Sequence, residues 1–305
     1  MVLQLSNTTD ILQGVTKLRI RVIFATAILL AGLGLWAENA LTVFVSVPPQ
    51  VEAARRIGGP AVQVEVLVPP GLSPESYQLN IRTYTALRAA KALFLIGMPL
   101  EQPLRERIAA RQPGLLLVDT REGMTFRDMD GQKCGGADHP HAAGADPHVW
   151  LDVENMIVHA RHLQRTFTAL QPEQAEKYRQ RAESYIQELQ ALQQELQTSL
   201  APYAGRQVLV VHPAFGYFLS RYGLLQLAVE QDGKEPGVRQ LQELLQTARS
   251  INAKAIFTQP QVSAQTAGSL ARHLGLEVAE LDPLPQEYCA GMRAIASQLQ
   301  RYLSP

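Results

Sequence analysis

Short apolar runs rich in β-branched residues recur along the chain and alternate with amphipathic stretches. Runs of this kind that end at Gly, Pro or a polar residue are typical of strands buried on both faces of a parallel sheet. The predicted strands are Leu41–Val47, Val62–Val68, Leu93–Ile96, Leu115–Val118, Val208–Val211, Leu225–Val229, Ala255–Phe257 and Leu276–Leu281. The predicted helices are Gln50–Ile57, Ala86–Ala92, Gln240–Ser250, Ala264–His273 and one that begins near Val153. This alternation predicts an α/β fold with mainly parallel sheets.

The stretch Pro172–Leu200 has the clearest helical pattern. Its apolar residues recur at intervals of three and four, and Pro202 and Gly205 follow its end. At 1.5 Å per residue this helix would be about 43 Å long. It could be the long core helix of one domain, but the strands on both sides favour two α/β lobes joined by one long rigid helix. The expected parts are a signal peptide at 1–40, an N-terminal lobe at 41–171, the linking helix at 172–201 and a C-terminal lobe at 202–305.

The first forty residues have the pattern of an export signal. Lys17, Arg19 and Arg21 precede the apolar run Val22–Trp36, and small residues follow it. A helix of this length would reach about 23 Å, which is short of the roughly 30 Å hydrocarbon core of a membrane. We therefore expect cleavage after Ala37 or Ala40 and export to a periplasm. An uncleaved signal anchor is the alternative.

Composition and charge narrow the classes of function. Lys and Arg number 28, as do Asp and Glu, so the formal net charge is zero. A nucleic-acid binder would show a basic excess, and we expect no nucleic-acid partner. The two cysteines, Cys134 and Cys289, are too few for a disulfide framework or a Cys-rich zinc module. They could pair with each other in an oxidising compartment.

Chemically versatile side chains lie just beyond several predicted strands. Glu75, His212 and Asp282 each follow such a strand, and His148 lies at the end of a polar loop before a helix. Ligands of open α/β sheets bind outside the carboxyl ends of the strands, so these four residues could meet in one cleft. Two imidazoles and two carboxylates suit Zn²⁺, with Mn²⁺ or Fe²⁺ as alternatives. Taken singly, each residue could equally cap or hydrogen-bond its own loop.

Four motifs around these residues resemble those of a known family. GLSPESY includes Glu75, DPHVWLD includes His148, HPAFGYF includes His212 and LDPL includes Asp282. In this order around a long helix, they resemble the motifs of zinc- and manganese-type substrate-binding proteins of ABC transporters. The resemblance implies two α/β lobes tied by a single long helix, a metal ion between the lobes and these residues as its ligands. It also implies delivery of the metal to an ABC permease in the inner membrane, and we expect the protein to be a monomer.

Glu75 departs from the family pattern. The family normally has His at this position, and a carboxylate makes the site harder and more negative, which favours Mn²⁺ or Fe²⁺ more than three imidazoles would. His212 has the opposite effect, because manganese-type members generally carry Glu there. Zinc is therefore our first expectation. Glu75 could instead point to solvent and leave three protein ligands and a water.

The remaining histidines are not expected to be ligands of this metal site. His139 and His141, in the polar loop Arg121–Asp146, could form an accessory metal collector like the His-rich loop of zinc-type relatives. The alternative is a solvated loop in which neither imidazole binds anything. The remaining expectations concern residues outside the four motifs: surface or packing roles for His159, His162 and His273, and a role at the edge of the site for Gln259.

Two other classes of function compete with the carrier. A zinc hydrolase would use three ligands with Glu75 as general base, but the sequence contains no HExxH or GxSxG motif. An adhesin on the same scaffold would share every motif. The linking helix predicts modest closure of the lobes. Because imidazoles ligate only when neutral, metal binding should weaken below about pH 6.

Overall fold

The computed structural model describes residues 40–128, 145–230 and 237–304. The chain divides into two compact units, Met1–Leu41 and Thr42–Pro305, and the fold below is that of the second. The predicted signal peptide, His139, His141 and Cys134 lie outside the described residues, so the expectations about them stay predictions. In the described part of the chain, no helix is long and apolar enough to cross a membrane.

The first lobe is built on a parallel sheet with strand order β2-β1-β3-β4. Its core consists of apolar side chains from the strands and from helices α3 and α4, such as Phe44, Leu93 and Leu104. The elements are β1 (Leu41–Val45), α2 (Val51–Gly58), β2 (Val62–Val66), α3 (Ile81–Leu87), β3 (Ala92–Leu95), α4 (Glu101–Arg111) and β4 (Leu116–Asp119), with short 3₁₀ turns η1 (Pro48–Gln50) and η2 (Gly59–Ala61).

The second lobe repeats this architecture with strand order β6-β5-β7-β8, again parallel. Its core gathers Leu209, Val211 and Ile256 with apolar residues of the covering helices. The elements are β5 (Gln207–Val210), α7 (Gly216–Arg221), β6 (Leu225–Ala228), α8 (Val238–Ser250), β7 (Ala255–Thr258), α9 (Ala264–Leu274), β8 (Glu277–Glu280) and α10 (Tyr288–Leu303). Two four-stranded parallel sheets confirm the predicted α/β class.

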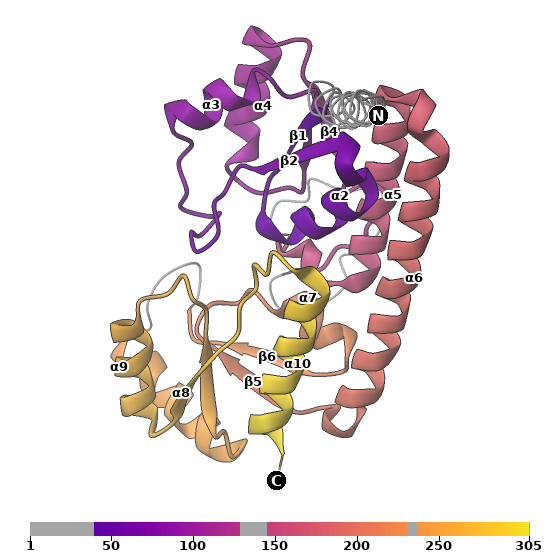
Figure 1. The fold of residues 1–305 in the computed structure, drawn as a ribbon. Coiled ribbons are helices and arrows are strands. Elements are labelled where there is room, and N and C mark those ends of the chain that lie inside the picture. Colours follow the sequence, from indigo (N-terminus) through magenta and orange to yellow (C-terminus); the bar gives the residue numbers. More distant parts are fainter. Residues whose placement is uncertain (1–39, 129–144, 231–236, 305) are drawn as a thin grey trace, which may run out of the picture. The chain divides into compact units, whose positions relative to one another are not determined.

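Two long antiparallel helices lie between the sheets in sequence and side by side in space (Figure 1). They are α5 (Val153–Leu170) and α6 (Ala175–Leu200), and the 3₁₀ turn η4 (Pro172–Gln174) connects them. The apolar stripe of α6, which includes Tyr178, Tyr185, Leu189 and Leu196, is buried. This stripe contacts α2 of the first lobe and α10 of the second. The predicted linking helix is therefore present, starts three residues later than predicted, and packs along both lobes. The exact lobe boundaries stay predictions.

The least accurate prediction is the helix at Ala86–Ala92, which is wrong. Helix α3 occupies Ile81–Leu87 instead, and Ala92 begins strand β3. The helix starts early because the Asn80 side chain accepts a hydrogen bond from the Thr83 amide and caps it. The sequence patterns predict no helix at the positions of α4, α7 and α10. The remaining 3₁₀ turns are η3 (Val149–Leu151) and η5 (Ala201–Tyr203).

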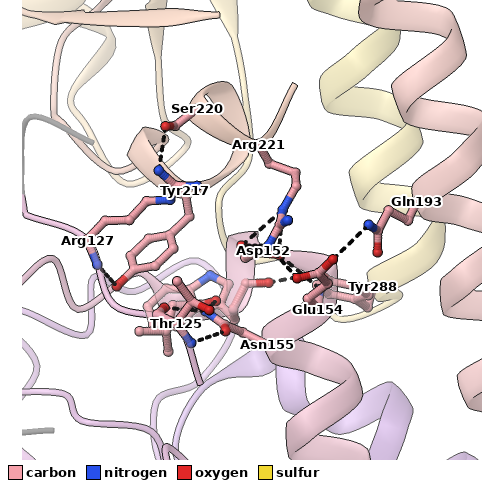
Figure 2. A network of polar contacts seen from close by, with 12 residues as sticks. Thr125, Arg127, Asp152, Glu154, Asn155, Gln193, Tyr217, Ser220, Arg221 and Tyr288 are labelled. Atoms are coloured by element: carbon pink, nitrogen blue, oxygen red, sulfur yellow. Dashed lines mark hydrogen bonds and ion pairs between the residues drawn. The ribbon is translucent and has the colours of Figure 1, made fainter. Parts of the chain in front are cut away.

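A charged network holds the start of α5 against α7 of the second lobe. Asp152 is fully buried. Its side chain caps α5 at the Glu154 amide and accepts three hydrogen bonds from the Arg221 guanidinium. Arg221 also bonds Glu154, which in turn accepts from Gln193 of α6, as Figure 2 shows. One cation from α7 therefore pairs with two carboxylates at the start of α5.

Tyr217 makes a second connection from α7. Its hydroxyl accepts from the Arg127 amide at 3.1 Å, and the Arg127 guanidinium bonds Ser220 (Figure 2). The same hydroxyl donates to the Asp146 carbonyl, also at 3.1 Å. The hydrogen bonds of α7 thus reach Arg127 and Asp146, both in the stretch before His148, while α7 itself follows His212 in sequence. The two halves of the chain are joined by buried polar contacts next to both histidines.

Replacing Arg221 by Ala is expected to lower the free energy of unfolding by about 3 kcal/mol, because it leaves the buried Asp152 carboxylate without its cation. Urea denaturation followed by circular dichroism measures this. Arg239→Ala is the control, since Arg239 forms an exposed pair with Glu243, and it should cost under about 1 kcal/mol. Equal costs for the two variants would contradict the role given to the buried pair.

Candidate metal centre

Three of the four predicted ligands meet at one point. The Glu75 Oε1 atom lies 3.1 Å from His212 Nε2 and 3.6 Å from His148 Nε2. The ligating atoms of these three residues all lie within 4.8 Å of one another. A carboxylate oxygen and two imidazole nitrogens at such separations form a ready set of donors for a divalent ion.

The fold brings each of these residues to the end of a different segment. Glu75 lies in the loop after β2, in a turn closed by a hydrogen bond from the Tyr77 amide to the Ser73 carbonyl. His148 immediately precedes η3 and α5, and His212 follows β5 after one residue. Glu75 and His212 are thus placed beyond the carboxyl ends of parallel strands, where α/β sheets bind their ligands.

Each imidazole is oriented by a carboxylate on its other nitrogen. The Nδ1 atom of His148 lies 2.7 Å from Asp146 Oδ1, and that same oxygen accepts the His148 amide. The Nδ1 atom of His212 lies 2.9 Å from Glu230 Oε2. With Nδ1 held by a carboxylate, Nε2 of each imidazole faces Glu75 and can bind a metal ion once it carries no proton. This arrangement of carboxylate, imidazole and open nitrogen is the one that metal-binding histidines adopt.

Asp146 and Glu230 were not predicted from the sequence. A signal existed for both. Asp146 stands two residues before His148 in the DPH motif, and Glu230 directly follows the predicted strand Leu225–Val229, as the proposed ligands follow theirs.

The charges of the site act on one another. Burial alone would lower the pKa of His212, but hydrogen bonds and attraction from Glu230 and Glu75 outweigh it and raise the pKa to about 9. The pKa of Glu75 is lowered, chiefly by its hydrogen bond to His212. Without a metal, the site is therefore held together by a protonated imidazole between two carboxylates.

Asp282 is not among the three residues that meet. Its Oδ1 atom accepts the Leu284 amide at 2.9 Å, in a turn after β8. Its neighbours Pro283 and Leu284, with Glu75, His148 and His212, line a cavity of about 10 Å³. That volume is close to what one water molecule or ion needs. Ligation by Asp282 stays a prediction.

Two glutamine side chains line the same cavity. Gln259 is only 8% exposed, and its Nε2 donor has no hydrogen-bond partner among the described residues. The buried Oε1 acceptor of Gln261 also has no partner among these residues. Buried polar atoms are normally satisfied, so this free capacity fits a water or ion held in the cavity.

Trp150 fixes the wall behind His148. Its indole Nε1 donates to the Pro283 carbonyl at 2.7 Å, and its ring meets the His148 imidazole edge-on. The Tyr288 hydroxyl donates in return to the Trp150 carbonyl. These bonds attach the segment after Asp282 to the segment that carries His148.

The other described histidines lie away from this point. His159 is fully buried against Phe94, and burial lowers its pKa to about 3. His162 bonds the Glu122 carbonyl, and the exposed His273 bonds the Ser269 carbonyl of its own helix. A second group of possible ligands, Glu52, Glu188 and Cys289, already pairs both its carboxylates with Arg56.

Sequence comparison shows which known proteins this chain is similar to. The sequence model of the family described as zinc-uptake complex component A, periplasmic, matches residues 43–302. The high-affinity zinc uptake system protein ZnuA of Yersinia pestis is 26% identical in an alignment of 280 residues that covers 85% of this chain and 87% of that protein. The manganese-binding lipoprotein MntA of Bacillus subtilis is 25% identical in an alignment of 250 residues that covers 77% of this chain and 76% of that protein.

A solved structure shares the fold. The crystal structure of ZnuA superimposes with a TM-score of 0.78 at 31% identity and covers 87% of this chain and all of that one. Members of the matched family bind metal, work with an ABC permease and are not enzymes, which excludes the hydrolase alternative. The chain belongs to this family of metal-binding substrate-binding proteins of ABC transporters.

Proposed function

We propose that the protein captures Zn²⁺ in the periplasm and delivers it to an ABC permease in the inner membrane. The observation that carries the proposal is the meeting of His148 Nε2, His212 Nε2 and Glu75 Oε1, with each Nδ1 held by a carboxylate. Such a site binds an ion through side chains that are already oriented, so little ordering is needed when the metal arrives.

The choice of zinc rests on the donor set. Two imidazole nitrogens suit Zn²⁺ better than Mn²⁺, which prefers oxygen donors. Glu75 in place of a third imidazole makes the site harder and leaves Mn²⁺ or Fe²⁺ as the alternative cargo. The named relatives include both a zinc and a manganese binder.

The fourth position of the metal has two candidates. Asp282 would complete a Glu-His-His-Asp set by turning its carboxylate into the cavity, whose wall already includes its neighbours Pro283 and Leu284. A water held by Gln259 and Gln261 would complete the set without that movement. We propose Asp282 as the ligand, and the water as the arrangement when Asp282 stays on the Leu284 amide.

Metal entry and release should involve ligand loops more than lobe motion. The contacts of Arg221 and Tyr217 hold the two lobes together beside His148 and His212. Glu75, in contrast, comes from a loop, and its side chain is more exposed than that of either histidine. We therefore propose modest lobe closure, with Glu75 as the ligand that moves most.

Elemental analysis of the purified protein should find one Zn²⁺ per chain. His212→Ala is expected to weaken zinc affinity at least about 100-fold in competition titrations, because it removes a ligand and leaves Glu75 with one imidazole. In the same titrations, Glu75→His should raise the preference for Zn²⁺ over Mn²⁺. The control for His212→Ala is His273→Ala, which changes an exposed histidine outside the site. Equal zinc affinity in the His212 and His273 variants would refute the site.

Zinc affinity is expected to rise about tenfold per pH unit between pH 7 and about pH 9. The raised pKa of His212 means that a proton occupies the metal-free imidazole up to about pH 9, and zinc must displace it. This moves the expected pH dependence well above the pH 6 that an ordinary imidazole would give. Competition titrations at pH 7.0 and 8.0 with a chelator of known pH dependence measure the slope. An unchanged affinity would contradict the raised pKa.

Glu230→Gln should weaken zinc binding by about 10- to 100-fold while leaving all three ligands in place, because the imidazole of His212 loses the anion that orients it. The same variant should lower the pKa of His212 in an NMR titration of the metal-free protein. Glu277→Gln, an exposed residue at the start of β8, provides the matched control. A Glu230 variant with wild-type affinity and an unshifted His212 would show that Glu230 has no orienting role.

A further inference from the structure

Helices α3 and α4 of the first lobe enclose a groove with a volume of about 400 Å³. Two contacts bridge it: the Arg107 guanidinium stacks 4.8 Å above the Tyr84 ring, and the Gln112 side chain donates to the Leu87 carbonyl. The groove is lined only by residues of α3 and α4 and of the positions directly after them, and it shares no lining residue with the metal centre.

The floor and one edge of the groove are apolar. Leu87 and Ile108 line it from below, and Tyr84 forms part of its wall. Ile81, at the start of α3, is 83% exposed, the largest exposure of any large apolar residue in the described chain. An isolated exposed isoleucine needs no explanation, but here it adjoins an apolar groove, which is typical of a contact surface.

The rim of the groove is formed by Arg88, Arg107 and Arg111, all exposed. None of the three forms an ion pair within the described part of the chain, and no carboxylate lines the groove. Arginines elsewhere in the described chain, such as Arg56, Arg221 and Arg293, form ion pairs with carboxylates. The local sequence has the same bias, because residues 76–100 contain Arg82, Arg88 and Lys91 but no acidic residue.

This combination defines the chemistry of an occupant. Arginine forks pair with carboxylates in a bidentate manner, and the apolar floor calls for an aliphatic or aromatic side chain. A flat lipid surface could touch Ile81 and the arginine tips but could not fill the groove down to Leu87 and Ile108. A protein segment with an apolar side chain flanked by Asp or Glu fits all of these features.

We propose that the groove between α3 and α4 docks an acidic, partly apolar segment of the membrane-spanning subunits to which the protein delivers its metal. This proposal rests on the proposed function, and it gives the first lobe a contact of its own with the transporter. Complementary charge of this kind raises the rate of encounter and fixes the register of docking.

The test uses the metal-loaded full chain and the membrane subunits of its transporter, reconstituted in nanodiscs of phosphatidylcholine. Arg88→Glu combined with Arg107→Glu is compared with wild type and with a matched control, Arg249→Glu combined with Arg272→Glu. The control arginines are exposed on α8 and α9 and form no ion pair within the described residues. A milder pair, Arg88→Gln with Arg111→Gln, guards against misfolding and keeps the stacking of Arg107 on Tyr84.

The groove variants should bind the nanodiscs at least about tenfold more weakly than wild type, with a smaller dependence on salt, and should keep wild-type zinc affinity. The control pair should bind like wild type. Equal binding by the groove and control variants overturns the docking proposal and leaves metal capture intact. A wild-type protein that does not bind zinc would instead refute the proposed function. Binding to vesicles of anionic phosphatidylglycerol alone, lost in the groove variants, would assign the groove to lipid and also overturn the proposal.

Discussion

One carboxylate shared by two imidazoles is the interaction on which the site depends. The Glu75 oxygen lies within reach of His148 and His212, which come from different lobes. Each imidazole can face Glu75 only because Asp146 or Glu230 holds its other nitrogen. In the metal-free protein a proton on His212 offsets part of the negative charge of these carboxylates. A divalent ion can replace that proton without any rearrangement of the hydrogen bonds on Nδ1.

The scaffold makes this geometry possible by holding two sheets in a fixed relation. Helix α6 buries its apolar stripe against both lobes, and α7 contacts the first lobe through Arg221 and Tyr217. The buried Asp152 connects α5 to α7, since its carboxylate caps α5 and accepts hydrogen bonds from Arg221. The segments that carry the two histidines are therefore attached to the same polar network, whereas Glu75 is attached to its own loop.

Much of the fold was predictable because buried parallel strands and a long amphipathic helix have strong sequence periods. The strand ends then indicated Glu75 and His212, and the end of the polar loop before α5 indicated His148. Helix α4 was missed because its sequence, EQPLRERIAAR, has few apolar residues, and α3 because its Asn80 cap was not recognised. Asp146 and Glu230 were missed because an orienting role depends on which nitrogen an imidazole offers, and only the spatial structure shows that. The position of Asp282 depends on a local turn with Leu284, which the LDPL motif alone does not specify.

The most direct measurement is a crystal structure of the zinc-loaded protein with anomalous data collected at the zinc edge. We expect a single strong peak about 2.0–2.2 Å from His148 Nε2, His212 Nε2 and a Glu75 carboxylate oxygen. Nδ1 of both imidazoles should remain bonded to Asp146 and Glu230. A peak at any other group of residues, or zinc in this cavity without contact to both imidazoles, would contradict it.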